Sequence, residues 1–305
     1  MLEGISGLRA RLVAAARPTG RGGMNRPRLY QWALAAGALG VVAALVVGTV
    51  GLATALAALA LPVAGLVYLH RAGRPLAVLA AAALSGGLAG AGLALLTRLY
   101  LEQLPLAQLV ALGQGRPPLS LVLLLGITLP LLGDLAKQVG PLLLRRWPRC
   151  RDEVLDGVVL GVTSGVGFAA ASTLVNYWPI IRDGYAPTGA AGLRDWTATL
   201  AGLAVVRPLV HAATGGLIGA GLWASTLRRG RVTLPVIVGL VGGMAYGLGE
   251  QLLLRWGTPA VLALHGLVLA VLLTMLRRTI REALLVDTRA AGRGRACGTL
   301  SCCDE

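Results

Sequence analysis

The sequence predicts an all-α protein, a polytopic membrane helical bundle of about eight transmembrane helices with both termini in the cytoplasm. Three observations carry this prediction. Of the 305 residues, 56% are hydrophobic and only 13% are charged, whereas a soluble domain carries roughly 25% charged residues. Several apolar stretches reach the roughly 20 residues that a helix needs to cross a bilayer. The basic residues, which dominate a net charge of +15, gather on alternate connections between those stretches.

The apolar stretches define the predicted spans in chain order. We place them at residues 30–50, 52–70, 75–97, 119–144, 154–177, 197–226, 233–254 and 257–276. The first two are separated only by the short Gly-Thr-Val-Gly segment at 48–51, so a seven-span alternative stays open. The connections at 98–118 and 176–196 are the longer ones, and the first is semi-polar enough for a helix that lies in the membrane interface.

The arginines orient the bundle. With the N-terminus inside, 21 of the 28 basic residues fall on the cytoplasmic side. The opposite side holds five of them, namely Arg98, Arg116, Arg182, Arg194 and Arg255. Short cytoplasmic loops of membrane proteins carry this excess of Lys and Arg. The positive charge is therefore explained by topology, and we expect a lipid bilayer and no nucleic acid as the partner of the basic surface. We expect a multi-pass protein of the bacterial cytoplasmic membrane.

Three regions follow from these patterns. Residues 1–29 form a basic cytosolic leader, residues 30–276 the transmembrane bundle, and residues 277–305 a basic cytosolic tail that contains cysteines. The tail ends in Cys-Gly-Thr-Leu-Ser-Cys-Cys-Asp-Glu, a spacing that matches no zinc pattern. We expect residues 297–305 to be a solvated segment without regular structure.

Glycines are frequent inside the spans. Gly157, Gly161 and Gly165 are spaced by four, which places them on one helix face. Small residues at this spacing allow a neighbouring transmembrane helix to approach closely. We expect this face to be a packing surface.

Ionisable residues interrupt the apolar spans. Asp134 and Lys137, the only lysine in the chain, lie in the fourth span, Arg207 and His211 in the sixth, and His265 in the eighth. Such groups are expensive in hydrocarbon and mark functional sites when they face the bundle interior. Counted at about 1.5 Å per residue, Asp134, His211 and His265 all fall near the midplane. Two interpretations remain, a shared polar site and a purely structural Asp134–Lys137 ion pair.

The motifs around these residues resemble those of PrsW-type membrane proteases, relatives of the CAAX-processing enzymes. The first family motif has a proline, a glutamate pair and a lysine, and here Pro130, Gly133-Asp134 and Lys137 stand at that spacing. Further along come Asp156-Gly157 and a glycine-rich run to Gly167-Phe168-Ala169. The last two motifs are Arg207, His211 and Thr214, then His265-Gly266. The resemblance covers residues 119–276 and implies a PrsW-like core there.

The motifs also depart from the family. One of the two adjacent acids is Gly133, the other is the shorter Asp134, and Ser172 and Thr173 stand where the family has Glu-Asn. Glu250, near the outer end of the seventh span, is a candidate to replace a lost carboxylate.

The resemblance implies an intramembrane endopeptidase that hydrolyses a peptide bond of a membrane-anchored protein. Asp134, His211, His265, Lys137 and Arg207 are then the expected catalytic residues. His211, His265 and Asp134 are the expected ligands if a divalent metal such as zinc takes part, since imidazole and carboxylate both bind zinc. The alternative is a catalytically inactive PrsW-like pseudoprotease that binds and regulates a transmembrane partner.

Overall fold

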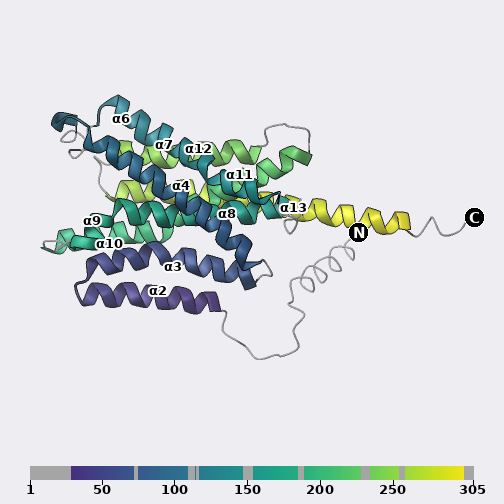
Figure 1. Ribbon diagram of the computed structural model, residues 1–305, viewed down its shortest axis with the longest axis horizontal. Helices are drawn as coiled ribbons and strands as arrows, with labels where there is room; N and C mark the ends of the chain where they lie inside the picture. Colours follow the sequence, from purple (N-terminus) through teal and green to yellow (C-terminus); the bar gives the residue numbers. More distant parts are fainter. Residues whose placement is uncertain are drawn as a thin grey trace, which may run out of the picture.

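The computed structural model describes residues 29–71, 75–108, 114, 117–146, 154–184, 189–227, 234–253 and 258–298. Helices dominate these residues, and no strand occurs among them, which confirms the all-α class. The long helices run roughly side by side (Figure 1). They are α2 (Leu29–Val46), α3 (Val50–Arg71), α4 (Leu76–Glu102), α7 (Leu129–Leu144), α8 (Val154–Asn176), α11 (Arg207–Leu227), α12 (Leu234–Leu253) and α13 (Thr258–Gly298).

Helix α8 lies at the centre of the bundle, where its most extensive contacts are with α11 on one face and α4 on the other. A Cβ atom on Gly161 would collide with the carbonyl oxygen of Gly215, and one on Gly165 with that of His211. Gly157 faces Gly219 in the same way. The predicted close-packing face at 157, 161 and 165 is therefore confirmed, and its partner is α11.

The opposite face of α8 meets α4 through a second set of small residues. A side chain on Gly86 or Gly90 would collide with the backbone carbonyls of Ser164 or Phe168, and one on Gly167 with that of Ala83. Without a hydrophobic driving force between helices in lipid, such backbone proximity supplies the packing energy. The glycines thus fix α4, α8 and α11 as one layered unit.

Helices α2 and α3 form an antiparallel pair at the edge of the bundle (Figure 1). Gly48, with φ of +79°, makes the reversal, and Thr49 closes it by donating its amide to the Ala44 carbonyl at 2.8 Å. The first two predicted spans are therefore two separate helices. Helix α9 (Trp178–Asp183) packs against α3 at Gly51.

Two helices widen locally into π turns, each directly before a proline. The segment η1 (Leu124–Thr128) precedes Pro130 of α7, and η2 (Gly202–Val206) connects α10 (Gly189–Ala201) to Pro208 of α11. Proline has no amide hydrogen and its ring collides with the carbonyl four residues back, so a wider turn relieves both problems. Each π turn lies within three turns of the ionisable residues of its span.

Six helices are long and apolar enough to cross a membrane among the residues that the structure describes. They are Val50–His70, Leu76–Glu102, Leu119–Leu144, Val154–Asn176, Trp196–Ala224 and Ala260–Leu285. The apolar part of α2, Gln31–Val46, is shorter, and α12 does not belong to the six although it packs against α11 and α13. Eight spans with both ends inside stays a prediction.

Helix α13 continues well past residue 276, where the last span was predicted to end, and reaches Gly298. Part of the predicted tail at 277–305 is therefore helical. Of the leader predicted at 1–29, residues 1–28 lie outside the described residues, and residue 29 begins α2. Residues 299–305, with Cys302 and Cys303, and Cys150 also lie outside them.

Candidate active site

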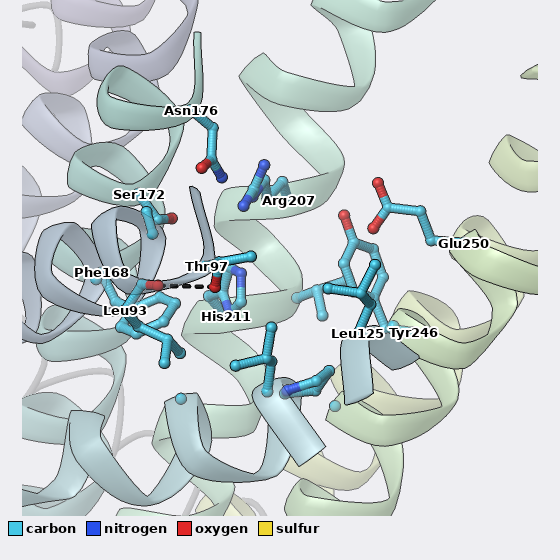
Figure 2. Close-up of a pocket in the computed structure, with 18 of the residues that line it drawn as sticks. Leu93, Thr97, Leu125, Phe168, Ser172, Asn176, Arg207, His211, Tyr246 and Glu250 are labelled. Atoms are coloured by element: carbon cyan, nitrogen blue, oxygen red, sulfur yellow. Dashed lines mark hydrogen bonds between the residues drawn. The ribbon is translucent and has the colours of Figure 1, made fainter. Parts of the chain in front are cut away.

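A cavity of about 410 Å³ lies between α4, α7, α8, α11 and α12. Its walls carry three of the five ionisable side chains that the sequence placed inside the spans, Asp134, Arg207 and His211. Figure 2 labels the last two. Glu250, Gln251, Ser172, Asn176 and Tyr177 supply further polar groups of the lining. Leucines, glycines and Phe168 supply the rest of the lining. The cavity thus gathers polar side chains between otherwise apolar helices.

A fully buried ion pair stands at the wall of this cavity. The Lys137 ammonium contacts Asp134 Oδ1, and the two side chains are 0% and 3% exposed. The same ammonium donates to Thr214 Oγ1 at 3.0 Å, and the Thr214 hydroxyl lies 3.0 Å from Asp134 Oδ1. His211 Nδ1 lies 3.2 Å from Lys137 Nζ. Helices α7 and α11 therefore join through one network of four polar side chains.

The backbone around the network is held by neighbouring helices. Ser164 of α8 donates its hydroxyl to the Lys137 carbonyl at 2.6 Å, and Gln138 Nε2 donates to the Gly215 carbonyl at 3.3 Å. The missing side chain of Gly165 lets α8 rest directly on the His211 carbonyl. The glycine face found in the sequence consequently sets the height of His211 relative to Lys137.

Three polar atoms of residues that line the cavity have no hydrogen-bond partner among the described residues. They are Asp134 Oδ2, Arg207 Nε and Gln251 Oε1, and all three are inaccessible to bulk solvent. Gly243 of α12 faces Asp134 Oδ2 so closely that a Cβ there would overlap the oxygen. Because buried polar atoms are nearly always paired, these three atoms are the candidates on the cavity wall to bind a ligand or water.

A row of aromatic rings crosses the site from α8 to α13. Phe168 and His211 have centroids 5.0 Å apart, and His211 and Tyr246 have centroids 6.2 Å apart in an edge-on arrangement. His265 then stacks on Tyr246 at 4.1 Å. His265 is buried but does not line the cavity. The structure thus brings Asp134, Lys137 and His211 together and leaves His265 beyond the ring of Tyr246.

The sequence did not single out Tyr246, Asn176 or Gly243. Tyr246 precedes Glu250 by one helical turn, so both reach the cavity from the same face of α12 (Figure 2). That spacing, with glycines at 243 and 247, was the available signal. Glu250, suggested as a replacement carboxylate, does line the cavity, and its side chain lies beside the Tyr246 hydroxyl (Figure 2).

The comparison with protein families agrees with the motifs. A model of the PrsW family intramembrane metalloproteases matches residues 74–277 of the 305. The chain belongs to this family. The match includes α4, which lies before residue 119 where the motif resemblance begins, so the PrsW domain contains all five helices of the cavity. No curated protein and no solved structure matches the chain.

Family membership and the six apolar helices make the chain an integral, multi-pass membrane protein. The family description also implies a metal. Among the residues that the structure describes, no three His, Cys, Asp or Glu side chains come together in a way that could hold a metal ion. The predicted ligands His211, His265 and Asp134 are not assembled as such a group, and Lys137 already engages Asp134 Oδ1 and His211 Nδ1. The donor set present does not fit a metal held by three protein ligands.

Proposed function

We propose that this PrsW protein is an intramembrane endopeptidase in which Asp134 activates a water molecule inside the cavity. The observation that carries the proposal is the unpaired Asp134 Oδ2, buried on the wall of a cavity of about 410 Å³. Because Asp134 lines the cavity, a small movement of its side chain brings this unpaired carboxylate oxygen to a position where it can accept a proton from water. Family membership supports the same reaction class.

The other oxygen of the carboxylate explains why Oδ2 is available. Lys137 and Thr214 both engage Oδ1, so the carboxyl plane is held from one side. A general base must lie within hydrogen-bond reach of the proton that it removes, with its orientation fixed by neighbours. Lys137 is then a positioning residue that also balances the carboxylate charge.

The proposed hydrolytic step uses water, the substrate and side chains of this cavity. The water oxygen attacks the peptide carbonyl carbon while one water proton passes to Asp134 Oδ2. The proton then moves to the amide nitrogen as the C–N bond breaks, which leaves a carboxyl group and an amine. Arg207 Nε, unpaired on the same cavity, is a donor for the negative charge that develops on the carbonyl oxygen. Such donors stabilise the transition state most strongly in water-excluded sites.

The size of the cavity limits the substrate. An intact helix is about 10 Å across with its side chains, and an enclosed volume of about 410 Å³ holds only a few residues of extended chain. We therefore propose a membrane-anchored protein whose scissile segment unwinds on entry. The bacterial cytoplasmic membrane stays the predicted location.

A regulatory pseudoprotease is the second candidate, and Gly133 favours it. Where the family has the first glutamate of its pair, a Cβ would lie 3.0 Å from Phe168 Cζ and 3.3 Å from Leu93 Cδ2. The ring of Phe168 thus occupies the approach that a larger side chain needs. With a single carboxylate at this point, already paired with Lys137, the chain would bind a transmembrane partner without cleaving it.

Reconstituted protein separates the two candidates. Wild type, Asp134→Ala, His211→Ala and His265→Ala are each mixed in proteoliposomes with a library of transmembrane peptides, and products are identified by mass spectrometry. The protease proposal expects cleavage by wild type and its loss in Asp134→Ala, with His265→Ala retaining activity. If peptides are captured but none of the four proteins gives a cleavage product, the result supports the pseudoprotease instead.

A further inference from the structure

The Lys137 ammonium occupies the point at which the side chains of α7 and α11 converge. An ammonium carries three N–H donors and no acceptor. Lys137 Nζ has three acceptors within reach, namely Asp134 Oδ1, Thr214 Oγ1 at 3.0 Å and His211 Nδ1 at 3.2 Å. Its side chain is 0% exposed. All of its donors are therefore used inside the protein, and no other lysine exists in the chain to take its place.

This contact decides where the proton of His211 lies. Because the ammonium can only donate, His211 Nδ1 must accept, and its lone pair points at Lys137. A neutral imidazole with an acceptor at one nitrogen carries its hydrogen on the other. His211 is then the tautomer with the proton on Nε2. Phe168 and Tyr246 pack against its ring, which keeps it in this orientation.

The same contact removes the donors that a metal ion would need. A histidine binds a metal through a free lone pair, and in His211 one nitrogen faces Lys137 while the other bears hydrogen. Asp134 retains only Oδ2. A divalent cation at this point would therefore have one free carboxylate oxygen and would stand next to a fixed positive charge.

We propose that the Lys137 ammonium keeps this site from holding a metal ion, and that His211 is a hydrogen-bond donor to the cavity through Nε2–H. The ammonium holds Asp134 and His211 in place as a bound metal cation would, but it belongs to a side chain of the protein. The donor role of His211 toward a peptide carbonyl rests on the proposed protease function. The tautomer and the absence of metal affinity do not depend on that function.

Metal binding tests the first part. Purified protein in detergent is titrated with Co²⁺, and binding is followed by the d–d absorption of the ion and by competition with Zn²⁺. We expect no stoichiometric binding by wild type, and affinity at least about tenfold higher in Lys137→Met, which frees Asp134, His211 and Thr214. Lys137→Arg keeps the charge and should resemble wild type. One equivalent of Co²⁺ bound by wild type and lost in His211→Ala would overturn the proposal, even if Lys137→Met fails to fold.

Nitrogen NMR tests the tautomer. Wild-type protein with ¹⁵N-labelled histidine gives signals from His70, His211 and His265, and the His211→Gln variant assigns the one of interest. We expect His211 to be protonated at Nε2 in wild type. A proton at Nδ1, or at both nitrogens near neutral pH, would overturn the inference. Neither measurement requires cleavage, so an inactive protein leaves both readouts intact.

A glutamine substitution tests the donor role once cleavage is measured. The side-chain amide introduced by His211→Gln offers an N–H group where the imidazole offered Nε2–H, but it is neither a base nor a metal ligand of comparable strength. We expect His211→Ala to lower kcat by about 10²-fold, in the range seen when a transition-state donor is removed, and His211→Gln to recover most of that loss. Equal loss in both variants would contradict a donor role and favour a base.

Discussion

The buried ion pair makes a prediction that can be worked out from its geometry. Replacing Lys137 by methionine keeps an unbranched side chain, shorter by the nitrogen atom, and removes the charge. This change leaves the Asp134 carboxylate buried with Thr214 as its remaining partner. Breaking a buried pair on one side costs about 3–5 kcal/mol. Since about 1.4 kcal/mol is a factor of ten, the unfolding equilibrium should shift by roughly two to more than three orders of magnitude.

A double-mutant cycle measures the same effect as a coupling. Asp134→Asn alone should also destabilise, because the buried ammonium then has only the neutral acceptors Thr214 and His211 and a side-chain amide around it, with no opposite charge. The double variant should be more stable than the sum of the two losses implies, with a coupling of about 2 kcal/mol or more, because it leaves no buried charge without its partner. Unfolding in mixed detergent micelles, followed by circular dichroism, gives all four free energies.

The pair of Arg98 and Glu102 provides the matched control. It is also an intrahelical pair, at 2.9 Å, but its side chains are 47% and 53% exposed. The cycle of Arg98→Gln and Glu102→Gln should give a coupling below about 1 kcal/mol. A coupling at Asp134–Lys137 no larger than that of the exposed pair would refute the reasoning that the buried charges depend on each other.

Three further predictions concern packing and the cavity. Gly161→Ala should destabilise the bundle by about 1–3 kcal/mol, as overpacking does, because its Cβ collides with α11. Gly92→Ala has open space around its Cβ and should not destabilise the bundle. Unfolding in detergent measures the stability of both variants. Gly243→Ala should leave the helices folded but displace Asp134 Oδ2, so its cleavage rate should fall while its circular dichroism stays unchanged. Arg207→Gln should lower kcat more than KM if Nε stabilises the transition state, and an effect on KM alone would assign it to substrate binding.

The sequence was sufficient to predict the helical class, the boundaries of most helices and the packing face at Gly157, Gly161 and Gly165. These features depend on local composition and on spacing along one helix. The extension of α13 beyond residue 276 was not predicted, because the span was ended at the arginines that begin at residue 277, whereas the apolar helix continues to Leu285. The π turns before Pro130 and Pro208 also need the three-dimensional context, since a proline predicts a disturbance but not its form.

The site was predictable in part. Asp134 and Lys137 are one turn apart, so their pairing follows from the sequence alone. The contact of Lys137 with His211 depends on the register between α7 and α11. Gln138 sets this register through its hydrogen bond to the Gly215 carbonyl, and Gly165 of α8 sets it through its close contact with the His211 carbonyl. The interposed ring of Tyr246 could not be foreseen, because equal depth in the membrane does not specify which side of a helix two histidines approach from.

The most direct test of the proposed chemistry is the cleavage rate of Asp134→Asn in proteoliposomes, measured beside Asp156→Asn. Asp156 is a similarly buried carboxyl near the start of α8, and it does not line the cavity. If Asp134 is the general base, its amide variant should lose about 10²-fold or more in kcat, in keeping with the contribution of such groups, while Asp156→Asn cleaves at a rate near that of wild type. Cleavage by Asp134→Asn at the wild-type rate would contradict the account.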